Sequence, residues 1–215
     1  MRILRLLILM LAVALAASAS RAAGLTREQA LKALEAPETG VRLGAVERLA
    51  EIGRMDDADR LLGRLTDSDA HVRASATDAI WRIWSRSGDP AIDSLFARGV
   101  EQMQDSEFDT ALATFSAIIA RKPDFAEGWN KRATIYFLLG ENEKSLKDCD
   151  EVLKRNPNHF GALSGAGQIY LRLGDPEQAL KSFRRAFDVN PNLEGIEQII
   201  SSLERYLRDR DQKMI

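Results

Sequence analysis

The sequence has one cysteine and two histidines among 215 residues, and this scarcity excludes several kinds of site. A lone thiol, Cys149, cannot form an intramolecular disulfide, and the chain has too few thiols for a zinc or iron–sulfur cluster. His71 and His159 have no His or Cys at ligand spacing, so we expect no metal and no cofactor. A catalytic thiol needs an adjacent base, so we predict a protein that is not an enzyme. An enzyme that uses Cys149 is kept as an alternative.

An excess of charge of one sign is also lacking. The chain has 30 Lys and Arg against 32 Asp and Glu, a net charge of -2. Lys131-Arg132 and Arg184-Arg185 are isolated basic pairs, not a stripe, so the sequence predicts no nucleic-acid partner. The hydrophobic content of 45% and charged content of 29% are ordinary for a soluble folded protein.

Long apolar runs are absent except at the N-terminus. Arg2 and Arg5 precede the apolar stretch Leu6–Ala19, the pattern of a secretory signal peptide over residues 1–19. Cleavage before Ser20 fits the small residues that precede it, and a cut up to residue 23 also fits. The run is shorter than the ~20 residues that span a bilayer. We therefore expect export to a bacterial periplasm and a mature chain that is soluble and not membrane-spanning.

No segment has the period-two alternation of a half-buried strand; a period of 34 residues is present instead. Pro123, Pro157 and Pro191 are each 34 residues apart. The same offset relates five further sets: Leu95, Trp129 and Leu163; Gly99, Ala133 and Gly167; Phe115, Cys149 and Phe183; Tyr136 and Tyr170; and Gly140 and Gly174. This register predicts a repeated unit whose fixed positions are packing residues. The equivalence with two phenylalanines predicts that Cys149 is a buried packing residue.

Each unit is predicted to be a pair of helices. In the last unit the first helix covers residues 161–173 and ends at Gly174, which accepts a left-handed conformation. Asp175 is placed to cap the second helix, with Pro176 at its first position, where the missing N–H costs nothing. The second helix covers residues 176–189 and stops before Pro191.

These positions carry a resemblance to a known family, the tetratricopeptide repeat (TPR). The matching residues are Trp129, Ala133, Tyr136, Gly140, Val152 and Pro157 in the middle unit, and Leu163, Gly167, Tyr170, Gly174, Ala179, Phe183, Ala186 and Pro191 in the last. The three units are placed at 92–125, 126–159 and 160–193. The first departs from the pattern, with Arg98 at an apolar position, Gln102 where Tyr recurs and Ser106 where Gly recurs.

The resemblance implies that the first helix of each unit lines a concave face that binds an extended peptide or an amphipathic helix. That face would present Phe96, Val100, Met103, Asn130, Thr134, Phe137, Ser164, Gln168 and Leu171, with Arg172 at the rim. Some TPR proteins clamp a terminal carboxylate with Lys, Asn and Arg side chains. Here the corresponding places hold Phe96, Val100, Gly161 and Gly165, so we predict no such clamp, and we expect Gly165 to thin the groove wall.

The N-terminal half, residues 24–90, shows a second periodicity. The stretches 41–52 and 72–83 align with an offset of 31, and each begins with Val-Arg. This pattern resembles HEAT-type helical repeats. Thr26 and Gln29 are spaced as a capping box, which predicts a helix start there.

The C-terminal end and two small groups of residues have informative patterns as well. Residues 194–208 read as a capping helix and 209–215 as a polar tail, because repeat arrays need a polar outer side. Trp81 and Trp84 lie three apart, which fits core packing or an exposed docking patch. Asp148, Asp150 and Glu151 point in different directions on a helix and read as a solvated face.

Together the patterns predict an all-α fold, a right-handed helical-repeat solenoid that is HEAT-like in its N-terminal half and TPR in its C-terminal half. The predicted function is a non-catalytic scaffold or adaptor of the bacterial cell envelope that binds a protein or peptide of unknown identity. A self-assembling structural component is the alternative, through the Trp81/Trp84 face or the capping helix, and homo-oligomerisation is left open.

Overall fold

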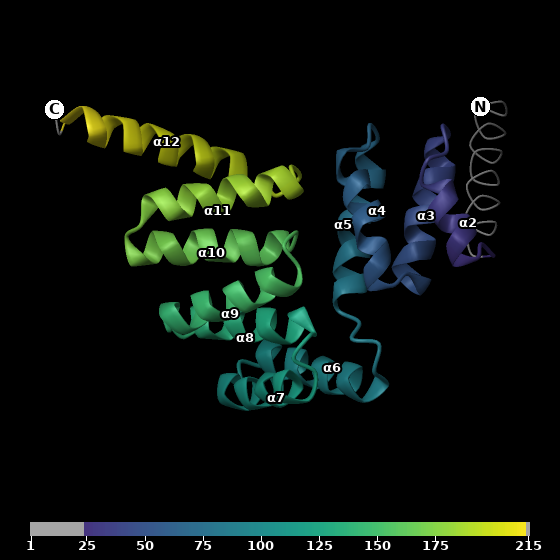
Figure 1. The fold of residues 1–215 in the computed structure, drawn as a ribbon, viewed down its shortest axis with the longest axis horizontal. Helices are drawn as coiled ribbons and strands as arrows, with labels where there is room; N and C mark the ends of the chain where they lie inside the picture. The colour runs from purple at the N-terminus through teal and green to yellow at the C-terminus, as the bar shows by residue number, and fades with distance from the viewer. Residues whose placement is uncertain (1–23, 214–215) are drawn as a thin grey trace, which may run out of the picture. The chain divides into compact units, whose positions relative to one another are not determined.

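A computed structural model describes residues 24–213, so the predicted signal peptide lies outside the described residues. The chain divides into two compact units at Ser85–Arg86 (Figure 1). Eleven α-helices and two short 3-10 helices form the described part, which contains no strand. The all-α helical-repeat class is therefore confirmed. Among the helices between Gly24 and Lys213, none combines the length and apolar character that crossing a bilayer requires.

The N-terminal unit is built from two helical pairs. Its helices are α2 (Arg27–Ala33), α3 (Thr39–Ile52), α4 (Ala58–Leu62) and α5 (Ala70–Trp84), with 3-10 turns at Met55–Asp57 and Gly63–Thr66. The predicted capping box is confirmed, because Thr26 Oγ1 accepts from Gln29 N and the Gln29 side chain accepts from Thr26 N.

The 31-residue period of this unit is repeated in its contacts. Arg42 Nη1 donates to the carbonyls of Ala36 and Pro37, and Arg73 Nη1 donates to those of Asp67 and Ser68. Each arginine therefore ties down the turn that precedes its own helix, at the same sequence offsets. Arg42 also makes a two-point ion pair with buried Asp67, with both N–O distances 2.8 Å.

The two tryptophans of α5 pack against each other. Their ring centroids are 5.5 Å apart in an edge-to-face arrangement, and Trp84 is buried. Such pairs favour the contact of a positive ring edge with a negative ring face. Trp84 is thus a packing residue, whereas Trp81 is half-buried.

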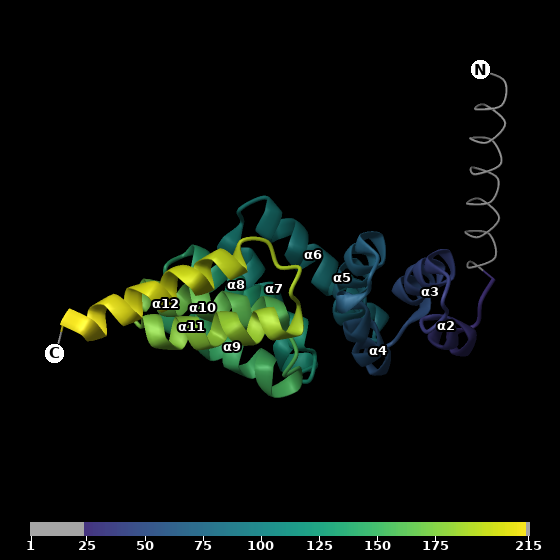
Figure 2. The ribbon, with the colours of Figure 1, turned by 90° about the horizontal axis from the view of Figure 1, so that it is seen from above.

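The C-terminal unit consists of three antiparallel helix pairs and a final helix that follow one another through the stack (Figures 1 and 2). The pairs are α6 (Pro90–Gln104) with α7 (Phe108–Arg121), α8 (Ala126–Leu138) with α9 (Asn142–Arg155), and α10 (Phe160–Leu173) with α11 (Pro176–Val189). The last helix, α12 (Ile196–Lys213), continues to Lys213, so the predicted tail from residue 209 is mostly helical.

The turns follow the expected chemistry. Gly174 has φ +76°, Asp175 accepts from Gln178 N, and Pro176 opens α11. Gly140 takes the same left-handed conformation after α8, with φ +78°. In the divergent first unit Ser106 occupies this place with φ +63°. The backbone of the first unit thus keeps the repeat geometry without glycine.

The recurring small residues allow close packing inside each pair. A Cβ added at Gly99 would lie 2.8 Å from the ring of Phe115, and one added at Gly167 would lie 2.8 Å from the ring of Phe183. Both phenylalanines have no exposed surface. In the middle unit the small residue is Ala133 and its neighbour in the core is Cys149, which is smaller than Phe. The larger Ala133 in place of glycine is thus compensated by the smaller Cys149 in place of phenylalanine. This explains why a cysteine occupies the position where phenylalanine recurs.

Candidate functional site

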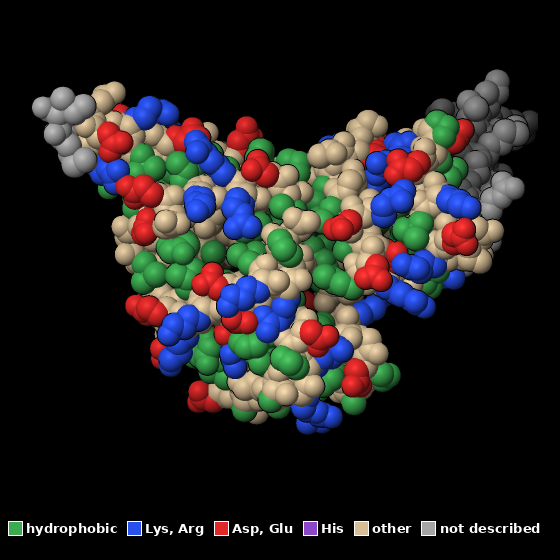
Figure 3. All heavy atoms as spheres, in the orientation of Figure 1, with side chains coloured by type: hydrophobic (Ala, Val, Ile, Leu, Met, Phe, Trp, Pro, Cys, Tyr) green, Lys and Arg blue, Asp and Glu red, His purple; other side chains and the backbone are tan. Residues whose placement is uncertain are grey.

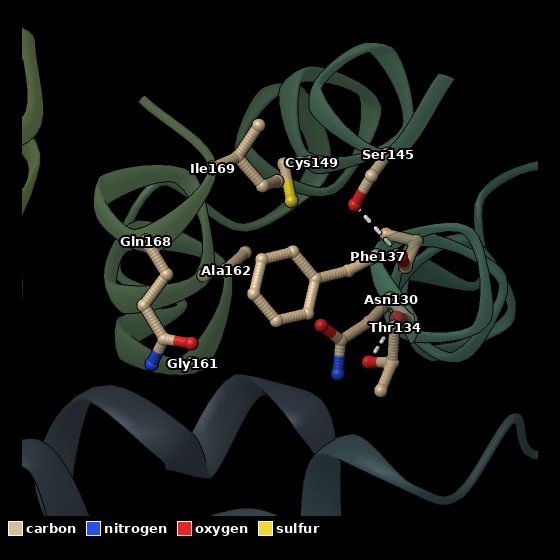
Figure 4. A pocket seen from close by; sticks show the side chains of 11 residues that line it. Asn130, Thr134, Phe137, Ser145, Cys149, Gly161, Ala162, Gln168 and Ile169 are labelled. Carbon is tan, nitrogen blue, oxygen red and sulfur yellow. Dashed lines mark hydrogen bonds between the residues drawn. The ribbon is translucent and has the colours of Figure 1, made fainter. Parts of the chain in front are cut away.

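A pocket of about 130 Å³ lies between α8 and α10, and Ser145 and Cys149 of α9 line its upper side in Figure 4. Four residues expected on the concave face line it: Asn130, Thr134, Phe137 and Gln168. The other lining residues are Ala133, Ser145, Cys149, Gly161, Ala162, Gly165 and Ile169. The Phe137 ring reaches from α8 toward α10 (Figure 4).

The remaining predicted face residues are placed differently. Phe96 is a core side chain, 7% exposed, with its ring 5.9 Å from Phe115 and 5.3 Å from Phe125 in edge-to-face contacts. Val100 and Met103 are half-buried against the same core cluster. The expectation that Phe96 presents an open binding surface is therefore corrected: its large ring fills the interior of the first pair.

Three predicted residues on α10 lie outside the pocket lining. Ser164 is half-buried and Leu171 is exposed. Arg172 does form the rim, because its guanidinium stands 3.5 Å from the centroid of the Phe137 ring and its Nη1 donates to the Phe137 carbonyl at 2.7 Å. This contact ties the end of α10 to the end of α8.

The pocket residue Asn130 belongs to a buried polar network that the sequence did not reveal. Glu127 Oε1 is 2.7 Å from His159 Nε2, and neither side chain is exposed. Asn130 Nδ2 donates to Glu127 Oε2 at 3.0 Å, and Lys131 Nζ lies 3.8 Å from the same oxygen. Burial favours a raised pKa for the Glu127 carboxyl, but the hydrogen bonds from His159 and Asn130 and the Lys131 charge outweigh it and lower the pKa below its ordinary value. Glu127 is therefore an ionised, acceptor-only group.

The network also fixes the start of α10. His159 is its N-cap residue, and His159 Nδ1 accepts from Ala162 N at 3.0 Å. Because Nδ1 accepts, the proton of the neutral ring must be on Nε2, which donates to Glu127. The two residues are 32 positions apart, at opposite ends of one repeat unit. No local motif signals such a pairing; only the repeat register could have placed them side by side.

The ion pair between Arg132 and Asp148 corrects the expectation that the acidic run on α9 is a solvated face. Asp148 is 4% exposed and accepts from Arg132 at 2.7 and 2.8 Å, instead of lying on a solvated face. The guanidinium also lies 5.1 Å from the Trp129 ring centroid. Asp150 is exposed, whereas Glu151 pairs with Lys154 and Arg155. Only part of the acidic run is therefore solvated.

The Cys149 thiol lies in the pocket wall and is 3% exposed. Burial, with the nearby Asp148 and Asp150, raises the pKa of this thiol to about 12. At neutral pH the sulfur is thus a protonated packing atom.

On the face of the C-terminal unit seen in Figure 3, basic and acidic side chains are interspersed with hydrophobic ones. Large exposed hydrophobic residues occur at the ends of α8 and α10, namely Leu138, Leu139, Leu171 and Leu173. The two helices that line the pocket therefore both end in exposed apolar side chains.

Comparison with known proteins finds similarity to one repeat family in the C-terminal unit. A family model described as "Tetratricopeptide repeat" matches residues 124–192. A TPR repeat-containing protein of Rhizobium etli is 33% identical over 96 residues, which is 44% of this chain and 47% of that protein. The chain thus spans about half the length of this curated relative.

Two solved structures share the fold. The first TPR of Spaghetti (RPAP3), bound to an HSP90 peptide, has a TM-score of 0.52 at 20% identity and covers 54% of this chain and 93% of its own. The Sgt2 TPR domain from Aspergillus fumigatus has a TM-score of 0.53 at 18% identity and covers 58% and 83%. Residues 124–192 are therefore similar to the tetratricopeptide repeat family, and the C-terminal unit shares the helical-repeat fold of these solved structures.

Proposed function

We propose that the C-terminal unit is a non-catalytic interaction module that binds a peptide segment along α8 and α10. The observation that carries this proposal is the pocket, which gathers Asn130, Thr134, Phe137 and Gln168 from two successive repeats. Amide and hydroxyl groups beside an aromatic ring suit an extended chain, whose backbone needs hydrogen-bond partners and whose side chains need apolar contacts. The first TPR of Spaghetti is bound to a peptide, and this supports a peptide as the class of ligand to test.

We propose binding and not catalysis, because the two groups near the pocket that could act as nucleophile or base, Cys149 and His159, are already engaged in packing and hydrogen bonds. The thiol is protonated and buried, and His159 is engaged at both ring nitrogens. Neither is placed to act on a bound molecule in the pocket.

We further propose that the protein acts as a scaffold or adaptor in the bacterial cell envelope after export, and that residues 24–90 form HEAT-like repeats. Export is motivated by Arg2, Arg5 and the apolar stretch Leu6–Ala19. Replacing Leu9 and Leu11 with Arg should retain the protein in the cytoplasmic fraction. Recovery of this variant in the periplasm would contradict the export proposal.

Peptide selection tests the binding proposal. Random peptides displayed on phage are panned against the immobilised protein and against a variant with Thr134→Arg and Gln168→Arg, two exposed changes that fill the groove without touching the core. The matched control carries Thr110→Arg and Gln178→Arg, the same changes at exposed positions of α7 and α11. Wild type and control should enrich one common consensus that the groove variant loses. Enrichment of the same sequences by all three proteins would overturn the proposal.

A further inference from the structure

The orientation of the Asn130 amide is determined by the buried network to which it is hydrogen-bonded. Its amide could face either way, but the ionised Glu127 carboxylate accepts hydrogen bonds only and so requires the Nδ2 group on its side. His159 strengthens this requirement, since its Nε2–H already occupies the other carboxylate oxygen. The carbonyl oxygen Oδ1 of Asn130 is consequently presented away from Glu127, toward the space between α8 and α10 (Figure 4). Asn130 is only 9% exposed, and Oδ1 has no hydrogen bond among the described residues.

Two hydroxyl groups in the pocket use their single hydrogen in hydrogen bonds to backbone carbonyls. Thr134 Oγ1 donates to the Asn130 carbonyl at 2.9 Å, and Ser145 Oγ donates to the Ala133 carbonyl at 2.7 Å (Figure 4). A hydroxyl has a single proton, so both oxygens offer only lone pairs to a ligand. The wall formed by α8 and α9 therefore presents acceptors at all three of its polar side chains.

The opposite wall is open because α10 has glycine at Gly161 and Gly165. Glycine inside a helix costs about 1 kcal/mol relative to alanine. At Gly99 and Gly167 packing requires it, but a Cβ added at Gly165 would meet only Cys149 Sγ, at 3.9 Å, which is ordinary contact. Packing therefore does not explain Gly165. Its effect is to leave room beside the α10 backbone for a group that enters the pocket.

We propose that this pocket is a subsite for an uncharged side chain that ends in a primary amide, and that it rejects the isosteric carboxylate. The amide N–H groups would donate to Asn130 Oδ1 and Thr134 Oγ1, while the methylene groups contact Phe137 and Ala162. The volume of about 130 Å³ is close to that of an engineered cavity of ~150 Å³ that holds benzene, so a side chain of glutamine size fits.

Hydrogen bonding and charge disfavour the two alternatives. A carboxylate has no hydrogen to donate and would place its lone pairs against the acceptor oxygens of Asn130, Thr134 and Ser145, which leaves all of them unpaired. An ammonium group would find that Lys131 already neutralises Glu127, at 3.8 Å, and would face the Arg172 guanidinium at the rim. The neutral donor is the species that satisfies the acceptors without an unpaired charge.

This inference rests on the proposed function, since it treats the pocket as part of the peptide groove, but small probes test it separately. Propionamide, propionate and propylammonium reproduce the ends of Gln, Glu and Lys side chains. Each is titrated into the ¹⁵N-labelled protein, and the amide shifts of Ala133, Gly165 and Gln168 are followed. Propionamide should bind at roughly millimolar concentration, as expected for so small a probe. Propionate and propylammonium should bind at least about tenfold more weakly, the loss of one hydrogen bond.

Two variants test the cause. Gly165→Ala should fold with an unchanged or higher Tm and lose propionamide binding, whereas the matched control Gly40→Ala, at an open helical position, should keep it. Glu127→Gln places an amide donor beside Asn130, which lets the Asn130 amide turn over. The preference for propionamide over propionate should then shrink or reverse.

Several outcomes would overturn the inference. These are equal binding of propionate and propionamide to the wild type, no binding of either, or unchanged propionamide binding by Gly165→Ala. If selected peptides still bind the groove while the probes give such a result, the subsite is wrong and the proposed function stands. If the probes behave as expected but no peptide is selected, the peptide function fails and the amide site remains.

Discussion

His159 Nε2 lies 2.7 Å from Glu127 Oε1, with both side chains fully buried and the two residues at opposite ends of one repeat. The same imidazole caps α10 through Nδ1. One side chain therefore joins the second repeat to the third, holds a buried charge and sets the polarity of the pocket. The stability of this junction should depend on it.

Replacing His159 with Ala removes the cap and leaves the Glu127 carboxylate without its main donor. We expect a loss of about 2–4 kcal/mol in the free energy of unfolding, from the lost N-cap and from the unsatisfied buried carboxylate. Urea denaturation followed by circular dichroism measures it. Glu127→Gln keeps an acceptor for Nε2–H and should cost no more than about 1 kcal/mol at pH 7. A His159→Ala variant as stable as wild type would show that the pair is not a structural link.

The same pair predicts an acid dependence. The folded pKa of Glu127 lies below its unfolded value of about 4.3, so its ionisation contributes stability that is fully present above that pH. This contribution is lost as the pH falls through the folded pKa. The stability difference between wild type and Glu127→Gln should therefore be constant from pH 7 to about 5 and move in favour of the variant below about 4. A difference independent of pH down to 3 would contradict it.

The repeat architecture could be predicted from the sequence because its signals are local or strictly periodic. Gly174, Asp175 and Pro176 define a helix end and a helix start by their own conformational preferences, and the structure places them so. The 34-residue register likewise assigns Cys149 to the core.

The site was only partly predictable, because side-chain pairing depends on contacts across repeats. Asn130, Thr134, Phe137 and Gln168 follow from helix periodicity and meet in one pocket. Phe96 follows from the same periodicity, but the first pair packs its ring inward on Phe115 and Phe125. Asp148 and Glu127 look solvated by composition and are buried by partners 16 and 32 residues away.

Ser106 should be a removable source of strain. It holds φ +63°, a conformation in which a Cβ is unfavourable, at the place where Gly140 and Gly174 end the equivalent helices. Ser106→Gly should raise the free energy of unfolding by about 0.5–1 kcal/mol, with a higher Tm by calorimetry. Gly140→Ser is the reverse change, with nothing within 4 Å of the added Cβ, and should lower it by about 1 kcal/mol. Destabilisation by Ser106→Gly would contradict this reading.

Cys149 should be chemically silent in the folded protein. With a pKa of about 12 and 3% exposure, its thiol is protonated and shielded at pH 8. Ellman's reagent should release no colour from the native protein within minutes and one equivalent after denaturation in guanidinium chloride. Fast native labelling would revive the alternative of a reactive thiol.

The proposed size compensation between Ala133 and Cys149 can be tested by restoring the Gly–Phe combination of the other two repeats. Phenylalanine is accommodated at this core position in the other two units because it faces Gly99 or Gly167. Cys149→Phe alone should therefore clash with Ala133 and cost about 1–3 kcal/mol by overpacking. Ala133→Gly alone should cost about 1 kcal/mol through lost helix propensity. The double variant restores the Gly–Phe combination of the neighbouring units, so it should be more stable than Cys149→Phe although it carries a second unfavourable change. Urea denaturation of the four proteins gives the coupling energy directly. If the losses in unfolding free energy of the two single variants simply add in the double variant, the two side chains do not compensate each other in size. Packing would then not explain the cysteine.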